Sequence, residues 1–471
     1  MLSKDVELIL DIFTKINRVP RCSKHEEKIA SWLIEWANSY GFRSKRDEFN
    51  NVLIEIPPSE TKKDSPSVVI QGHMDMVCEK DTLSSHDFSK DEIKTIIDGD
   101  WLRADRTTLG ADNGIALAIG LALAISKIEK PKIELLFTSD EETGLNGAKH
   151  IKSDFVEGKI LINVDSEDEG VFIIGCAGGE DTDIELDYDL SASHYNNAYE
   201  IAIDGLLSGH SGIDINKDRA NAIKLLFEFL DSVKDDVDLV LVDGGSARNA
   251  IPKSAKAVVV SDIPIDTMKY NIVNFLNSKR KEYPNEKSMT INIKQREAQN
   301  ECIKKDDFLK LLNLIRELPH GVHSMLDSKI THTSNNLAKI LTNKDSFIIH
   351  TNQRSLSEDE LTKITRFIES IAKKYDARYT SYNRYPAWQP NKDSSLVRKS
   401  KQVYEELFGK KPIIEVIHAG LECGIIGSKF DGMDMISIGP TIKDPHTPNE
   451  RLYIPSLDRI WKFLVYLLKE I

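Results

Sequence analysis

Several side chains that can bind a metal ion or a proton lie just beyond three short apolar runs of the sequence. They are His73 and Asp75 after the first run, Glu141 and Glu142 after the second, and Asp165 after the third. Apolar runs of this length are typical of buried strands, and the carboxyl ends of parallel strands meet at one edge of a sheet. Carboxylates crowded at such an edge raise one another's pKa unless a cation compensates their charge. The pattern therefore predicts a cation site.

Two further residues extend this pattern. Asp112 precedes an apolar helical run, where free backbone N–H groups and the helix dipole favour a carboxylate. His446 lies beyond the apolar run 435–438, which predicts another strand. Asp75 is two residues from His73, so on an extended chain both face the same side. The Asp75 carboxylate can then hold the imidazole in one tautomer while the other ring nitrogen binds metal.

Two imidazoles and three carboxylates among these residues form a predicted ligand set for two divalent ions: His73, His446, Asp112, Glu142 and Asp165. If Asp112 bridges the ions, each ion receives one histidine, a share of the bridge and one further carboxylate. Two doubly charged cations then meet three carboxylates and one hydroxide, so the site is nearly neutral. Mixed nitrogen and oxygen ligands suit Zn²⁺, with Mn²⁺ or Co²⁺ as further possible occupants.

Glu141 is not required as a ligand in this predicted metal site. Two divalent ions lower the pKa of a water that bridges them and polarise a carbonyl oxygen. Glu141 can then act as the general base, taking the proton of that water and handing it to a leaving amine. The predicted reaction is metal-dependent hydrolysis of an amide bond. An unligated base also argues against a non-catalytic metal-binding scaffold, because a protein that only stores metal does not need one.

The length of 471 residues predicts more than one domain. Strands alternate with helices over residues 1–185 and again over 384–471, which predicts an α/β catalytic domain with a mainly parallel sheet flanked by helices. Residues 186–383 change to an α+β pattern, which predicts an inserted domain.

The net charge of -13 argues against nucleic acid or an anionic membrane as a partner. The N-terminal residues lack the pattern of a signal peptide, and no apolar stretch is long enough to span a bilayer. The cysteines are scattered and odd in number, which predicts reduced thiols in the cytoplasm; they are Cys22, Cys78, Cys176, Cys302 and Cys423.

Three other features are assigned no catalytic part. Cys423 is predicted to be a buried, inert thiol, although it lies near the predicted site in the sequence. Glu422 either supports the site or caps a turn. The histidines of a polar stretch are predicted to be solvated rather than to bind metal; they are His320, His323 and His332.

The motifs together resemble the aminoacyl-histidine dipeptidases (Xaa-His dipeptidase, peptidase D), a family of di-zinc exopeptidases related to carnosinases and peptidase V. They follow the family order over essentially the whole chain. The motifs are Gly-His-Met-Asp-Met-Val (72–77), Thr-Leu-Gly-Ala-Asp-Asn-Gly (108–114), Asp-Glu-Glu-Thr-Gly (140–144), Asn-Val-Asp-Ser-Glu (163–167), Gly-His-Ser-Gly (209–212), Arg-Asn-Ala-Ile-Pro (248–252), His-Ala-Gly-Leu-Glu-Cys-Gly (418–424) and Gly-Pro-Thr-Ile-x-x-Pro-His (439–446). One departure is Ser208, which stands where the family pattern has glycine.

The resemblance implies that the predicted ligands bind zinc, that Asp75 orients His73 and that Glu141 is the base. It also implies that His210 stabilises the oxyanion. The inserted domain is implied to be a lid through which the protein forms a homodimer.

The resemblance further implies a small peptide substrate, with Xaa-His dipeptides such as carnosine-like compounds favoured among unblocked dipeptides. Asn249 and Arg354 are implied to hold its carbonyl or terminal carboxylate, and Gly420 to line the same pocket. Physically, Arg354 offers a planar fork that fits a carboxylate. A di-zinc deacylase or aminoacylase shares every predicted metal ligand and stays open as an alternative, because it differs only in the lid pocket.

Overall fold

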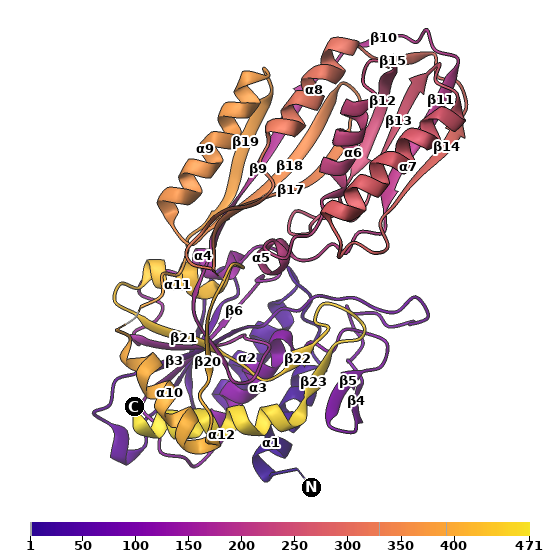
Figure 1. The fold of residues 1–471 in the computed structure, drawn as a ribbon. Coiled ribbons are helices and arrows are strands. Elements are labelled where there is room, and N and C mark those ends of the chain that lie inside the picture. The colour runs from indigo at the N-terminus through magenta and orange to yellow at the C-terminus, as the bar shows by residue number, and fades with distance from the viewer. Residues whose placement is uncertain (1, 329, 392) are drawn as a thin grey trace. The chain divides into compact units, whose positions relative to one another are not determined.

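The structure, a computed structural model, describes residues 2–328, 330–391 and 393–471. The chain divides into two compact units (Figure 1). The first comprises Met1–Cys176, Trp388–Val416 and Leu421–Ile471, and the second comprises Ala177–Ala387 and Ile417–Gly420. The boundaries predicted at residues 185 and 383 fall inside β9 (Gly178–Asp187) and β19 (Arg378–Tyr385). These two strands pair with each other, so both belong to the second unit.

The first unit is built around an eight-stranded sheet. The strand order is β1 (Arg43–Arg46), β2 (Val52–Ile56), β6 (Ile133–Thr138), β3 (Val68–His73), β7 (Ile160–Val164), β21 (Asp434–Ile438), β8 (Val171–Cys176) and β20 (Ile413–Ile417). The central strands β6, β3, β7 and β21 are parallel to one another. The pairs β1–β2, β2–β6 and β21–β8 are antiparallel. The predicted α/β class is confirmed, with a parallel centre and antiparallel flanks.

Helix α3 (Ala111–Ile125) is the central helix of this unit. It packs on β3 and β6, and its residues from Asn113 to Ala124 are all buried. A helix that is apolar on every side is stable only inside a core, and α1 (Lys4–Ile16) also packs on it. The other helices of the unit are α1 (Lys4–Ile16), α2 (Glu27–Ser39), α4 (Asn146–His150), α10 (Ser395–Phe408), α11 (Glu422–Lys429) and α12 (Ile454–Glu470), with the 3-10 turn η1 (Glu60–Lys62).

A four-stranded sheet completes the first unit. Its order is β22 (Ile442–Lys443), β23 (Arg451–Tyr453), β5 (Trp101–Ala104) and β4 (Thr95–Asp98). The loop between β22 and β23 carries His446, so this sheet positions one of the predicted ligands.

The second unit is an antiparallel α+β structure with its own apolar core. Its nine-stranded sheet runs β14 (Thr290–Arg296), β11 (Asn197–Asp204), β13 (Ala255–Ser261), β12 (Val237–Gly244), β17 (Thr331–Thr342), β18 (Ser346–Ser355), β9 and β19, with β16 (Gly321–Met325) paired to β17. β10 (Leu190–Ala192) and β15 (Glu301–Ile303) form a separate pair. The helices are α5 (Ser211–Asp214), α6 (Ala222–Ser232), α7 (Ile265–Glu282), α8 (Lys305–Glu317) and α9 (Glu358–Lys374). Its role as a lid stays a prediction.

The cysteines depart from the sequence-based prediction. Cys22 and Cys78 form a disulfide, with their Cα atoms 5.7 Å apart. The prediction of five reduced thiols is therefore wrong for these two, because residues 56 positions apart in the sequence meet in the fold. Cys176, Cys302 and Cys423 are buried and take part in no disulfide within the described residues. Burial raises the pKa of the Cys423 thiol well above its usual value, which agrees with the inert thiol predicted there.

Two of the histidines that were predicted to be solvated, His320 and His323, have different environments. His323 is exposed on β16, as predicted. His320 is instead held inside the second unit, where its Nδ1 lies 3.2 Å from Asn221 Nδ2 and accepts a hydrogen bond from the backbone N–H of Leu337. Burial lowers the pKa of His320 to about 3, so the imidazole is neutral. The prediction of a solvated role is wrong for His320.

Every helix in the described part of the chain is too short or too polar to cross a membrane.

The C-terminal end of α3 is closed by a buried lysine. Lys130 donates hydrogen bonds from Nζ to the carbonyl oxygens of Leu123, Ala124 and Ser126, at 2.6, 3.0 and 3.0 Å. We expect Lys130→Met to lower the free energy of unfolding by about 1–3 kcal/mol, because these carbonyl groups lose their donor. Urea unfolding followed by circular dichroism measures the change. In the exposed control Lys127→Met the change should stay within about 0.5 kcal/mol. Equal losses in both variants would contradict this account.

Candidate metal centre

The predicted ligands of the first unit converge around the Asp112 carboxylate. His73 Nε2 lies 3.0 Å from Asp112 Oδ1 and 3.5 Å from Asp165 Oδ1. His446 Nε2 lies 3.0 Å from Asp112 Oδ2 and 3.0 Å from Glu142 Oε1. Asp112 therefore presents one oxygen to each imidazole, and each imidazole has a further carboxylate beside it.

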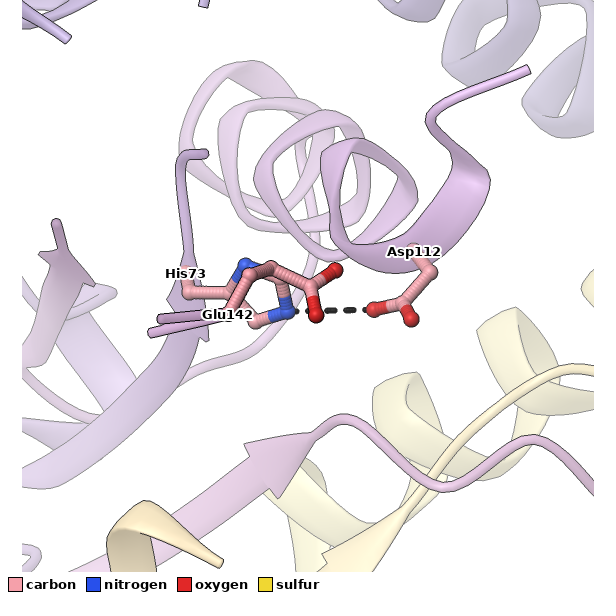
Figure 2. A group of neighbouring side chains, drawn as sticks. All are labelled: His73, Asp112 and Glu142. Atoms are coloured by element: carbon pink, nitrogen blue, oxygen red, sulfur yellow. Dashed lines mark hydrogen bonds and ion pairs between the residues drawn. The ribbon is translucent and has the colours of Figure 1, made fainter. Parts of the chain in front are cut away.

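Figure 2 shows His73, Asp112 and Glu142 pointing toward one another from separate parts of the chain. The ligand atoms of these three side chains all lie within 4.8 Å of one another. Donors this close can bind a metal ion together, so the described residues form a candidate metal site.

The parallel centre of the sheet explains why His73 and Asp165 meet. The register of β3 and β7 pairs Gln71 with Asn163. His73 and Asp165 are each two residues further along, so they emerge at the same carboxyl edge. The acidic pair Glu141 and Glu142 reaches this edge through the turn that follows β6.

Asp112 is positioned by the irregular start of α3. Asp112 and Asn113 have non-helical backbone angles, and Gly110 has a φ of 67°. The Glu450 carboxylate accepts hydrogen bonds from the backbone N–H groups of Leu109, Gly110 and Asp112, at 2.7, 2.9 and 3.1 Å. Glu450 is buried, and burial raises its pKa to about 7. No motif in the sequence marks Glu450, which lies in a polar stretch after His446.

Asp75 links the imidazole of His73 to the loop that carries the acidic pair. Its Oδ1 lies 3.3 Å from His73 Nδ1 and accepts a hydrogen bond from the backbone N–H of Glu141 at 3.0 Å. Its Oδ2 accepts a hydrogen bond from the N–H of Glu142 at 3.2 Å and from the Ser23 hydroxyl at 2.8 Å. Burial opposes ionisation of Asp75, but His73 lowers its pKa more strongly, so the carboxylate is charged.

The site holds more negative charge than its own side chains balance. Burial raises the pKa values of Glu142 and Asp165, and the nearby Asp112 raises both further. Burial alone lowers the pKa values of the two imidazoles, but the carboxylates raise them more, that of His446 to about 11. Glu142 Oε1 is buried and accepts no hydrogen bond among the described residues, although His446 Nε2 is nearby. These observations fit a cation-binding donor set.

Glu141 differs from its neighbour Glu142. No side chain in the described part of the chain bonds to its carboxylate, while Asp75 fixes its backbone N–H. Burial raises the pKa of Glu141 well above its usual value, with further contributions from Glu142 and Asp165. A carboxylate whose pKa is raised in this way holds a proton more readily than an exposed one, which suits a group that accepts a proton and passes it on.

Glu422 supports the site rather than capping a turn. This fully buried residue begins α11, and its Oε2 accepts hydrogen bonds from Gln71 Nε2 at 2.6 Å and Thr138 Oγ1 at 2.7 Å. Gln71 also accepts a hydrogen bond from Asn163 Nδ2 at 2.6 Å. Glu422 therefore connects β3, β6 and β7 just before the positions of the predicted ligands.

The remaining predicted residues belong to the second unit, where they form two groups. His210 precedes α5 and accepts a hydrogen bond at Nδ1 from Gly212 N–H. The carbonyl oxygen of Asn249 accepts a hydrogen bond from Ser211 N–H at 2.7 Å, which joins Asn249 to the His210 segment. Ser208 has a φ of 59°, a conformation that favours glycine and explains the glycine of the family pattern.

Arg354 and Gly420 meet at Tyr385. Arg354 lies on β18 and donates from Nε to Asn352 Oδ1 and from Nη1 to the Tyr385 hydroxyl, both at 3.0 Å. A Cβ atom at Gly420 would lie 2.7 Å from Tyr385 Cε2, so only glycine fits against this ring. Neither Tyr385 nor Asn352 was predicted from the sequence. Asn352 lies two residues before Arg354 on the same strand, whereas Tyr385 reaches Arg354 only because β18 and β19 both pair with β9.

Comparison with known proteins identifies the family of the chain. A model of Peptidase family M20/M25/M40 matches residues 69–470. The chain is 37% identical over 474 residues to the cytosol non-specific dipeptidase of Escherichia coli (strain K12), covering 98% of this chain and 97% of that protein. The aminoacylhistidine dipeptidase structure from Vibrio alginolyticus has a TM-score of 0.85 and 35% identity, covering 100% of this chain and 98% of that one.

A tripeptidase from Staphylococcus aureus shares the fold, with a TM-score of 0.57 and 16% identity over 99% of this chain and 98% of that one. The predicted resemblance to peptidases of the aminoacyl-histidine dipeptidase type is confirmed by the more similar relatives. The chain belongs to peptidase family M20/M25/M40.

Proposed function

We propose that this peptidase is a metal-dependent dipeptidase that hydrolyses unblocked dipeptides and favours Xaa-His substrates, carnosine-like compounds among them. The observation that carries the proposal is the Asp112 carboxylate lying between His73 and His446, each beside a further carboxylate. The names of the two more similar relatives support dipeptides as substrates. The name of the Vibrio alginolyticus relative supports histidine at the second position.

In the proposed site, His73 and Asp165 would hold one divalent ion and His446 and Glu142 the other, and Asp112, whose two oxygens face the two imidazoles, would contribute to both. Zn²⁺ is the proposed occupant, with Mn²⁺ or Co²⁺ as alternatives, because the donor set mixes imidazole nitrogen and carboxylate oxygen. Such ions supply Lewis acidity that makes water a nucleophile near neutral pH and polarises an amide carbonyl.

The proton transfers fall to Glu141 in this proposal. Its carboxylate takes a proton from the attacking water and delivers it to the amide nitrogen as the C–N bond breaks. The products are a carboxylate and a free amine. Asp75 keeps Glu141 in place through the backbone N–H of Glu141, and it orients His73 through Nδ1.

The second unit is proposed to bind the substrate. Arg354 uses Nε and Nη1 for Asn352 and Tyr385, while its Nη2 bonds to no described residue and so is left for the terminal carboxylate of a dipeptide. His210 is proposed to stabilise the oxyanion, and Asn249 and Gly420 to line the pocket. A lid function, a homodimer through this unit and a cytoplasmic location complete the proposal, and the name of the Escherichia coli relative supports the location.

A substrate panel tests the proposed function. Hydrolysis is measured for β-alanyl-histidine, other Xaa-His dipeptides, dipeptides without histidine, N-acetylated amino acids and tripeptides. We expect unblocked dipeptides to be cleaved, Xaa-His most efficiently, and a chelator to abolish activity that Zn²⁺ or Mn²⁺ restores. Cleavage of N-acetylated amino acids alone would favour the deacylase alternative. Full activity after complete metal removal would contradict the metal-dependent proposal.

The role of Glu141 is tested with Glu141→Gln. We expect kcat to fall about 10²–10⁴-fold while bound metal stays at the wild-type level, because the variant removes the proton acceptor without removing a ligand. Metal content by mass spectrometry and steady-state kinetics measure both effects. The exposed residue Glu415 on β20 provides the matched control Glu415→Gln, which should keep wild-type kinetics. Unchanged turnover in Glu141→Gln would remove Glu141 from the mechanism.

The role of Arg354 is tested with Arg354→Lys, which keeps the charge but loses the planar fork. We expect KM for dipeptides to rise about 10-fold with little change in kcat. Dipeptide amides, which lack the terminal carboxylate, should be cleaved equally by both proteins. The exposed residue Arg366 on α9 gives the control Arg366→Lys. An equal rise of KM for dipeptides and their amides would show that Arg354 does not bind the carboxylate.

A further inference from the structure

The segment from Arg21 to Glu26 contacts three separate parts of the chain that carry the candidate metal centre. The buried Arg21 donates from Nη2 to the carbonyl oxygen of Gly110 at 2.6 Å, at the start of α3. It also donates from Nη1 to the carbonyl oxygens of Met74 and Asp75, both at 3.3 Å, beyond the end of β3. Arg21 thus fixes the backbone on either side of the centre, next to His73 and next to Asp112.

Two more side chains of this segment extend the contact. The Ser23 hydroxyl donates to Asp75 Oδ2 at 2.8 Å, on the carboxylate that also faces His73 Nδ1. Glu26 accepts a hydrogen bond from the backbone N–H of Asp140 at 3.0 Å, directly before Glu141. The position of the segment therefore affects the orientation of one imidazole and of the acidic loop.

The Cys22–Cys78 disulfide fastens this segment to the chain beyond β3. Cys22 forms a parallel bridge with Met76, whose backbone N–H donates to the carbonyl oxygen of Arg21 at 3.1 Å. Cys22 stands between Arg21 and Ser23, and Cys78 follows Asp75 by three residues. Both cysteines are half-buried, so small thiols and disulfides can reach them.

We propose that Cys22 and Cys78 are a redox modification site whose oxidation state sets how tightly the metal centre binds its cations. This inference rests on the metal centre of the proposed function. In the oxidised state the covalent link holds Arg21 and Ser23 against Asp75 and the start of α3. In the reduced state only the hydrogen bonds hold the segment, and the ligands are less well ordered. Residues that orient metal ligands in this way change metal affinity by about 10–100-fold when they are lost.

The chemistry of the step is thiol–disulfide exchange with a small disulfide such as glutathione disulfide. The thiolate of one cysteine attacks a sulfur of the small disulfide, forms a mixed disulfide and releases one small thiolate. The second protein thiolate then attacks the sulfur of the first cysteine and releases the second small thiolate. Two protein thiols are oxidised, one small disulfide is reduced to two thiols, and a dithiol reverses the reaction. Reversible disulfides in cytoplasmic proteins are typically redox-sensing, which fits the proposed location.

The test compares Mn²⁺ binding to the full-length metal-free protein after treatment with glutathione disulfide or with dithiothreitol. Mn²⁺ is the probe because it prefers oxygen and imidazole donors to thiolates, so the freed cysteines do not compete. Alkylation under denaturing conditions and mass spectrometry count the thiols in each state. We expect five alkylated cysteines in the reduced protein and three in the oxidised protein. We also expect the Kd for Mn²⁺ to rise about 10-fold on reduction.

Variants separate the pair from other thiols. The double variant Cys22→Ser/Cys78→Ser should bind Mn²⁺ with the affinity of the reduced wild type, whether it is treated with glutathione disulfide or with dithiothreitol. The matched control Cys302→Ser removes a free buried cysteine of the second unit and should keep the full dependence on redox state. Circular dichroism verifies that reduction leaves the fold intact.

Several results would overturn the proposal. They are five free thiols after oxidation, or the same Kd for Mn²⁺ in the two redox states. Unfolding of the protein on reduction would also overturn it, because the disulfide would then serve only to stabilise the fold. Absence of Mn²⁺ binding in both states would instead refute the metal centre itself, and with it the proposed function. A third outcome would refute the proposed activity alone. In that case Mn²⁺ binding depends on the redox state, but the oxidised, metal-loaded protein cleaves no dipeptide.

Discussion

The repulsion between buried carboxylates at one sheet edge is the constraint on which the first unit depends. Asp112, Glu142 and Asp165 lie within a few ångströms of two imidazoles, and burial disfavours the charged form of each carboxylate. The neighbouring Glu141 and Asp75 add further carboxyl groups. Two protonated imidazoles do not balance the negative charge of all these groups. Burying so much negative charge is costly unless cations join it, so the geometry makes sense as a metal centre.

The rest of the unit holds these charges in position. The Glu450 carboxylate gathers three backbone N–H groups at the start of α3, and Asp75 gathers those of Glu141 and Glu142. Glu422 binds Gln71 and Thr138 directly and reaches Asn163 through Gln71, so it joins β3, β6 and β7 close to the candidate metal centre. Each of these carboxylates is buried and hydrogen-bonded, which orders the backbone and leaves the ligand side chains free to bind cations.

In the second unit, Arg354, which is proposed to bind the substrate, is held by neighbouring side chains. Asn352 and Tyr385 occupy two donor positions of Arg354 and so fix the plane of its guanidinium group. A fork held this way recognises a carboxylate by direction as well as by charge. The Cys22–Cys78 link is a different kind of support, because thiol chemistry can remove it without replacing a residue. The first unit therefore contains a covalent support that can be made or broken by the redox conditions around the protein.

The sequence by itself determined the fold class of the first unit and pointed to the residues that gather in its candidate metal centre. The pattern of apolar runs, each ending in His-x-Asp, Glu-Glu or Asp, is local, and parallel strands bring such ends together whatever the details of packing. Only the tertiary structure decided which atoms face one another and which residues support them. Glu450 and Asp112 are 338 residues apart, and Gln71 and Glu422 are 351 apart, so no local pattern records these pairs. The disulfide was missed for the same reason, since spacing alone cannot show that two distant cysteines meet.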